Sequence, residues 1–180
     1  MGEWKNVMIG ELCDSVSNTY NGNDTEVILI NTSDVLEGNI LNNCKVPNKN
    51  LKGQFKKTFK KNDILYSEIR PANKRFAFVD IDDTSLYIAS TKLMVLRPRA
   101  NIIEPRFLFA ILKSKQMLDK LQHLAETRSG TFPQITFDSE VAPIVIKLPD
   151  ILTQNKIVST LKSIEEKIKE NIKINKNLVA

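Results

Sequence analysis

The stretch TQNKIVSTLKSIEEKIKENIKINKNL, residues 153–178, decides the architecture of this chain. Its apolar residues recur in steps of four, three and four, and the same steps continue through two asparagines to a final leucine. That spacing is an a/d heptad seam, which holds one face of a helix against a partner helix over several turns. The seam consists of Ile157, Leu161, Ile164, Ile168, Asn171, Asn175 and Leu178.

This segment predicts a helix of about 39 Å, at about 1.5 Å per residue. Thr153 is the expected N-cap, because its hydroxyl can accept a hydrogen bond from a free backbone N–H of the first turn. A helix this long is better suited to joining or spacing domains than to closing a core. We therefore expect residues 151–180 to form a coiled-coil-type spacer and dimerisation helix, with the asparagines fixing register or partner.

Residues 1–150 have the length of one ordinary domain. Short β-type runs, among them Val27–Ile30, Ile64–Ser67 and Leu93–Leu96, precede one helical pattern that extends from Pro105 to Leu121. The order of these elements predicts a mixed α/β (α+β) fold, in which one globular domain with a mixed sheet is followed by the long terminal helix.

Composition and charge narrow the classes of function. The net charge is +5 with a pI near 9.1, which permits an anionic partner without proving one. No stretch approaches the ~20 apolar residues that cross a bilayer, and the N-terminus has no signal-peptide pattern. Cys13 and Cys44 match no metal-ligand spacing, so free thiols in a reducing compartment, and a cytoplasmic location, are expected.

Catalytic motifs are hard to find. His123 is the only histidine, and the six glycines form no phosphate-binding loop. The acidic segment 80–83 is better explained as a solvated turn than as a cation site. Asp150 followed by Glu165 and Lys167 resembles a nuclease pattern, but the last two sit two apart on a predicted helix and point to different faces. We expect no enzyme activity and no metal site in this chain.

Basic residues are the stronger indication of function. Seven lysines and no carboxylate lie between Lys45 and Lys61, and such a run is either a solvated loop or a contact to a phosphate backbone. Arginines in predicted turns add side chains that suit guanine edges as well as phosphate. The candidate DNA-facing residues are Lys56, Lys57, Lys60, Lys61, Arg70, Lys74, Arg75, Lys92, Arg128 and Ser129.

Seven motifs, in order along the chain, resemble the DNA specificity subunit of type I restriction–modification systems. They are Trp4 with Ile9–Leu12, Thr32–Val35 with Gly38–Ile40, Asn62–Ser67 with Ile69–Pro71, Ser90–Lys92 with Val95–Pro98, Gly130–Ile135, Ile146–Ile157, and Asn171–Leu178. Asn62 stands where the family usually has glycine, and asparagine also tolerates a positive φ. Asp150 and Thr153 replace a common proline and glutamate.

The resemblance implies a division of labour. Such a subunit binds double-stranded DNA through target recognition domains, and its conserved helices space those domains and dock modification subunits. Catalysis, S-adenosylmethionine and ATP with Mg²⁺ belong to the modification and restriction subunits, so no cofactor is expected on this chain.

The resemblance also implies a chain of roughly twice this length, with two recognition domains and two conserved helices. This chain corresponds to one of each, as a half-size subunit, a fragment or an expressed domain. The seam favours a homodimer that reads a split palindrome, one half-site per chain. A stand-alone DNA-processing enzyme, or a helical adaptor without DNA contact, is the alternative.

Overall fold

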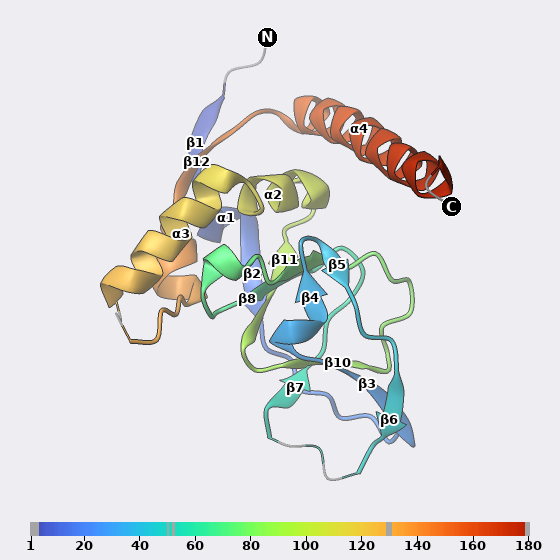
Figure 1. The fold of residues 1–180 in the computed structure, drawn as a ribbon. Helices are drawn as coiled ribbons and strands as arrows, with labels where there is room; N and C mark the ends of the chain where they lie inside the picture. Colours follow the sequence, from blue (N-terminus) through green and yellow to red (C-terminus); the bar gives the residue numbers. More distant parts are fainter. Residues whose placement is uncertain (1–3, 50, 52, 129–130, 179–180) are drawn as a thin grey trace.

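A computed structural model describes residues 4–49, 51, 53–128 and 131–178. Two four-stranded sheets, rather than the single mixed sheet expected, make up most of the molecule below the helices in the view of Figure 1. In one sheet the order is β6 (Lys45–Pro47), β3 (Glu26–Ile30), β10 (Tyr87–Ser90) and β7 (Phe55–Lys57). In the other it is β2 (Cys13–Val16), β11 (Leu93–Pro98), β8 (Ile64–Ser67) and β9 (Phe76–Phe78).

The remaining strands form two short antiparallel pairs. They are β1 (Lys5–Met8) with β12 (Val145–Leu148), and the hairpin of β4 (Val35–Leu36) and β5 (Asn39–Ile40). The helices are α1 (Ile9–Leu12), α2 (Pro105–Leu112), α3 (Lys115–Arg128) and α4 (Ile151–Leu178), with short turns η1 (Thr32–Asp34), η2 (Pro71–Asn73) and η3 (Phe137–Val141). The β3–β10 pair is parallel, so the fold is mixed α/β as predicted.

The sheet containing β8 is covered on both faces. Ile64 and Tyr66 of β8 belong to the core beneath α2 and α3, whereas Leu65 between them belongs to a second core with residues of β3 and β10. Successive side chains of a strand point to opposite faces. A strand buried on both faces therefore reads as a continuous apolar run, which is why β8, β9 and β11 stand out in the sequence.

The single helix expected between Pro105 and Leu121 is two helices. Lys113 and Ser114 separate α2 from α3, and the Ser114 hydroxyl accepts a hydrogen bond from the backbone N–H of Met117 at 3.3 Å. A serine in this position satisfies a free N–H of a new first turn. Apolar periodicity alone missed the break, because α2 and α3 both turn their apolar faces to the same core.

The terminal helix α4 contains 28 residues, about 42 Å of helix. The expectation that Thr153 caps it is wrong: Asp150 is the cap, and its Oδ1 accepts from the Thr153 backbone N–H at 2.8 Å. Asp150 stands directly before the first helical residue, so its carboxylate reaches the free N–H groups that Thr153 would otherwise serve. No helix of the described residues is long and apolar enough to cross a membrane.

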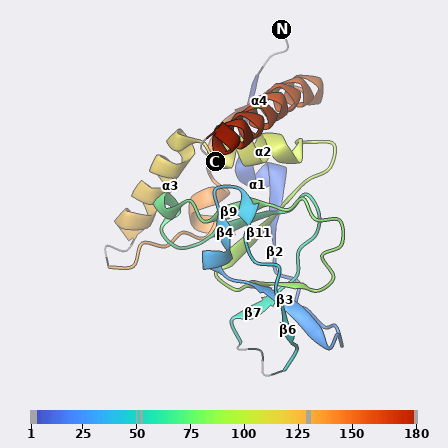
Figure 2. The same ribbon diagram turned by 45° about the vertical axis from the view of Figure 1, so that its right-hand side comes forward.

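The first half of α4 contacts the body, and Glu165 in its middle still pairs with Lys113 at 2.7 Å. Ile157 and Val158 contact the core beneath α2, and Gln154 is 1% exposed. Beyond them α4 runs past α2 into solvent, at the end of the molecule opposite β3, β6 and β7 (Figures 1 and 2). The domain boundary at residue 150 stays a prediction.

Candidate nucleic-acid interface

Four segments far apart in the sequence meet at one edge of the molecule. The backbone N–H of Glu68 donates to the carbonyl of Lys92 at 3.0 Å, and the Glu68 carbonyl accepts from Ile135 N–H at 2.8 Å. Thr91 N–H donates to the Gln54 carbonyl at 2.7 Å. These hydrogen bonds bring together the end of β8, the β10–β11 turn, the start of β7 and the segment that begins at residue 131.

Three of the predicted DNA-facing cations lie on these segments and are exposed: Lys56, Arg70 and Lys92. Arg70 has φ 45°, in the left-handed region that side chains rarely adopt, and its N–H donates to the Pro133 carbonyl at 3.1 Å. Such strain persists only where the surroundings hold it, and it concentrates at functional sites. The turn that presents Arg70 is therefore fixed.

Lys57 differs from its neighbour Lys56 because the two side chains leave β7 on opposite sides. The Lys57 side chain is only 13% exposed, and its ammonium donates to the carbonyls of Thr91 and Leu93 at 3.0 and 2.8 Å. Burial lowers the pKa of this ammonium, against the opposing effect of Glu68. The Lys57 ammonium uses its N–H donors inside the protein, so Lys57 does not belong to the residues expected to face DNA.

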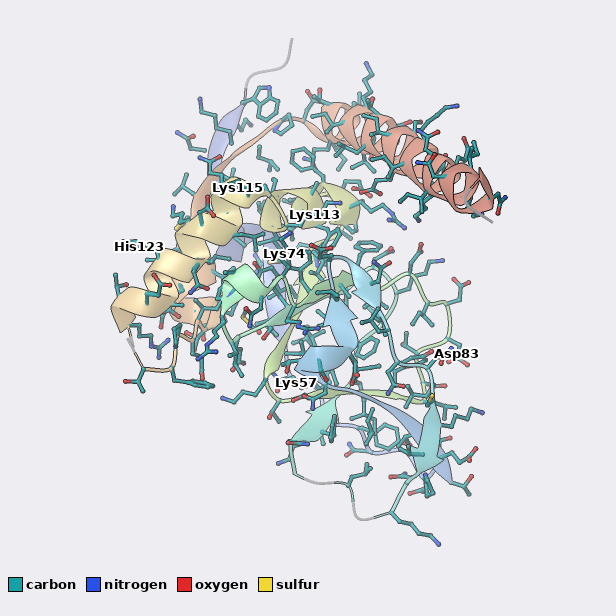
Figure 3. All side chains as sticks on the ribbon, viewed as in Figure 1. Lys57, Lys74, Asp83, Lys113, Lys115 and His123 are labelled. Carbon is teal, nitrogen blue, oxygen red and sulfur yellow. The ribbon has the colours of Figure 1, made fainter. Side chains whose placement is uncertain are left out.

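The lysine-rich stretch does not form one patch. Lys61 pairs with Asp82, whose hydrogen bond raises the pKa of the lysine. Lys60 begins the turn that Asp63 closes by accepting the Lys60 N–H at 2.8 Å, while Asp63 is held by Arg97 at 2.7 Å. Asp83, which is close in sequence to Asp82, lies at the right-hand edge of the view in Figure 3, to the right of Lys57.

The other candidates already have partners. Lys74 pairs with Glu37 at 2.7 Å, and Arg75 donates to the Ser33 carbonyl at 3.0 Å. Arg128 pairs with Glu140 of η3 at 2.9 Å, close in sequence to the segment that contains Ile135. Ser129 lies outside the described residues.

One carboxylate at this edge escaped the sequence analysis. Glu68 lies between two predicted DNA contacts, with Lys57 Nζ 3.9 Å from Oε1 and Lys92 Nζ 3.8 Å from Oε2. The Lys92 ammonium also donates to Oε1 of Gln134 at 3.5 Å. No local pattern marks Glu68, because its neighbours come from β7, the β10–β11 turn and the segment before η3.

The residues of the nuclease-like pattern are engaged separately. Asp150 caps α4, Glu165 pairs with Lys113 at 2.7 Å, and Lys167 pairs with Glu170. No group of three potential metal ligands occurs in the described part of the chain. His123 is exposed on α3, on the same side of the molecule as Lys115 (Figure 3).

The seam of α4 divides into a packed start and an exposed remainder. Ile157 contacts the core, whereas Ile164 and Ile168 are 51% and 53% exposed. The exposed apolar row runs from Leu161 to Ile172, a residue that the heptad analysis missed. Asn171 and Asn175 are also exposed, and the side chain of Leu178 lies outside the described part.

The described residues form a two-sheet domain with a helical cover, an edge with exposed cations from distant loops, and a long terminal helix. The chain belongs to the family described as type I restriction modification DNA specificity domain, whose model matches residues 1–178. This confirms the resemblance that the ordered motifs indicated.

Individual relatives agree with this assignment. The type I restriction enzyme HindI specificity subunit of Haemophilus influenzae is 46% identical over 180 residues, which cover 99% of this chain and 39% of the relative. The HsdS subunit of Thermoanaerobacter tengcongensis is 25% identical, with a TM-score of 0.79 over 93% of this chain and 43% of that one. A chain from a solved type I R-M system, 24% identical, has the same TM-score and so shares the fold. This chain spans less than half the length of these relatives.

Proposed function

We propose that this chain recognises one half of a split DNA target for a type I restriction–modification complex. The observation that carries the proposal is the convergence of Lys56, Lys92 and Arg70 on one edge, held there by backbone hydrogen bonds between distant segments. Exposed cations on a rigid edge suit phosphate contacts, which position a duplex while neighbouring side chains read bases. Arg128 lies at the border of this edge.

In this proposal the chain contributes recognition and no catalysis. Modification subunits, and in a restricting complex the restriction subunit, supply S-adenosylmethionine and ATP with Mg²⁺. Family membership and the names of the relatives support this division. Residues 1–150 then act as the target recognition domain, and residues 151–180 as the spacer that also docks a modification subunit.

The exposed row on α4 supports pairing with a second copy of the chain. Leu161, Ile164, Ile168 and Ile172 are 38–53% exposed, and four apolar side chains on one face gain stability by packing against another helix. A two-fold axis would place antiparallel helices between two recognition domains. The helix of about 42 Å is comparable to the ~34–36 Å between half-sites one turn apart on B-DNA.

The pairing is tested with two proline substitutions, Leu161→Pro and Ile168→Pro, combined in one chain. Proline in a helix interior removes a backbone hydrogen bond and costs about 3 kcal/mol, so the exposed half of α4 is expected to lose its helix and the chain to sediment as a monomer. A chain with Lys162→Ala and Lys169→Ala is the matched control. A proline variant that still sediments as a dimer refutes pairing through α4.

The decisive experiment maps N6-methyladenine across the genome of cells that express a cognate modification subunit, with and without this chain. An interrupted palindrome, methylated only when the chain is present, is the expected result. An asymmetric split motif would retain target recognition and overturn the symmetric pair. No new motif, together with no salt-sensitive binding of duplex DNA, would overturn the proposal in favour of an adaptor.

The alternative, that the chain is a stand-alone DNA-processing enzyme, predicts a different result in a cleavage assay. The purified chain alone, incubated with duplex DNA and Mg²⁺ or Mn²⁺, would cleave it. We expect the DNA to remain intact, because the residues of the nuclease-like pattern serve three separate contacts. Asp150 caps α4, Glu165 pairs with Lys113, and Lys167 pairs with Glu170.

A further inference from the structure

The carboxylate of Glu68 is fixed beside an exposed ammonium on the proposed DNA-facing edge. Its backbone is held on both sides, by Lys92 and by Ile135, and its Oε2 lies 3.8 Å from Lys92 Nζ. The Glu68 side chain is 17% exposed and that of Lys92 is 48% exposed. A recessed acceptor therefore lies next to a projecting donor.

Two further groups hold this pair in place. Lys57, anchored to two backbone carbonyls, lies 3.9 Å from Glu68 Oε1 on the buried side. Gln134 accepts from Lys92 Nζ at 3.5 Å. The acceptor and the donor both belong to loops that are tied together by backbone hydrogen bonds, so their spacing is set before any DNA arrives.

A carboxylate at a DNA-binding edge cannot serve as a phosphate contact, because both carry negative charge. It can only accept, so its favourable partner on DNA is an exocyclic amino group. In the major groove the cytosine edge shows the N4 amino donor alone, while adenine, guanine and thymine each place an acceptor there. Next to that amino group, the paired guanine presents O6 and N7, which accept from lysine.

We infer that Glu68 and Lys92 together read a single C·G base pair in the major groove. Glu68 accepts from cytosine N4, and Lys92 donates to O6 or N7 of the paired guanine. Lys57 and Gln134 are positioning residues for this pair. The inference rests on the proposed function, which it deepens by naming a base pair and the two side chains that recognise it.

The test compares wild type with Glu68→Met, which removes both accepting oxygens and keeps most of the side-chain volume, in the complex with its modification subunits, by selection of binding sites from randomised duplexes. Asp83→Asn is the matched control, because it removes one carboxylate charge outside the Glu68–Lys92 pair and can still accept from the Ser85 N–H through its remaining oxygen. Glu68→Met is expected to lose discrimination at one C·G position by about 5- to 150-fold. Discrimination at the other positions is expected to stay unchanged. The Asp83→Asn variant is expected to select the same DNA motif as wild type.

A change on the DNA gives an answer that does not depend on folding of a variant. Replacing cytosine at that position by 2-pyrimidinone removes the N4 amino group. Wild type and Asp83→Asn are expected to lose affinity by a similar factor, whereas Glu68→Met loses nothing further.

Three outcomes overturn the inference. In the first, Glu68→Met selects the same motif with the same discrimination. In the second, it binds every sequence more tightly by one factor, which makes Glu68 a counter-charge for the lysines. In the third, no cytosine in the wild-type site is sensitive to 2-pyrimidinone. A wild type without any sequence preference is a separate result, which refutes the proposed function itself.

Discussion

Gln154 joins the long helix to the body, and its replacement should loosen that junction. Its Oε1 accepts from the backbone N–H of Glu104 at 2.8 Å, and its Nε2 donates to the carbonyls of Pro149 at 2.9 Å and Ile102 at 3.4 Å. The side chain is 1% exposed, so water does not replace these partners once it is removed. The perturbation is Gln154→Ala.

The expected cost follows from the contacts. The two well-formed hydrogen bonds contribute about 1–1.5 kcal/mol each, and the third is too long to add much. The lost methylene adds about 0.8 kcal/mol of burial. The sum is a loss of about 3 kcal/mol in the free energy of unfolding. For a chain of this size that lowers Tm by roughly 6–12 °C.

The assay is equilibrium unfolding in urea, followed by circular dichroism. Gln154→Met removes the hydrogen bonds but keeps most of the side-chain volume. It should therefore lower the free energy of unfolding by more than half as much as Gln154→Ala does. Gln116→Ala, at an exposed position on α3, is the matched control and should stay within about 0.5 kcal/mol of wild type. A loss below about 1 kcal/mol for Gln154→Ala refutes the reasoning, because buried hydrogen bonds cannot be removed so cheaply.

Three further predictions concern single side chains. The hydrogen bond from the α4 backbone lowers the pKa of Asp150 from its ordinary 3.8. The stability that this cap adds is therefore present above that pH and is lost as the pH falls. The difference in Tm between wild type and Asp150→Ala should shrink on acidification. Burial raises the pKa of the Cys13 thiol to about 12. Ellman's reagent should therefore react only with the exposed Cys44 until the chain is unfolded. Two reactive thiols in the native protein would contradict this burial. Lys56→Gln should flatten the slope of log K against log salt by about 0.9 on duplex DNA without changing the preferred sequence, whereas Lys120→Gln on α3 should leave the slope unchanged.

Much of the fold could be predicted from local patterns. The runs Ile64–Ser67 and Leu93–Leu96 are buried throughout and apolar except at Ser67, because both faces of their sheet are covered, so their strands were found in the right places. What local patterns missed is the division into two sheets. Strand pairing depends on contacts between residues far apart, such as Ala89 of β10 with Ile30 of β3.

The candidate site was predicted only in part. Lys56, Lys92 and Arg70 were singled out and lie on one edge, although contact with DNA stays a prediction for each. Lys57 and Lys61 were singled out for the same reason, their charge, yet one is buried against backbone carbonyls and the other pairs with Asp82. A run of charges in the sequence does not say which side chains share a surface.

The sequence by itself determined the family, through seven motifs in a particular order, and the period of the long terminal helix. Both are written in the chain as short-range spacing, and neither depends on what packs against it. The tertiary structure alone decided that Glu68 lies beside Lys92 and Gln134, because hydrogen bonds between three distant segments bring them together. It also decided that Gln154 is buried, since that depends on the loop before α2 closing over the first turn of α4.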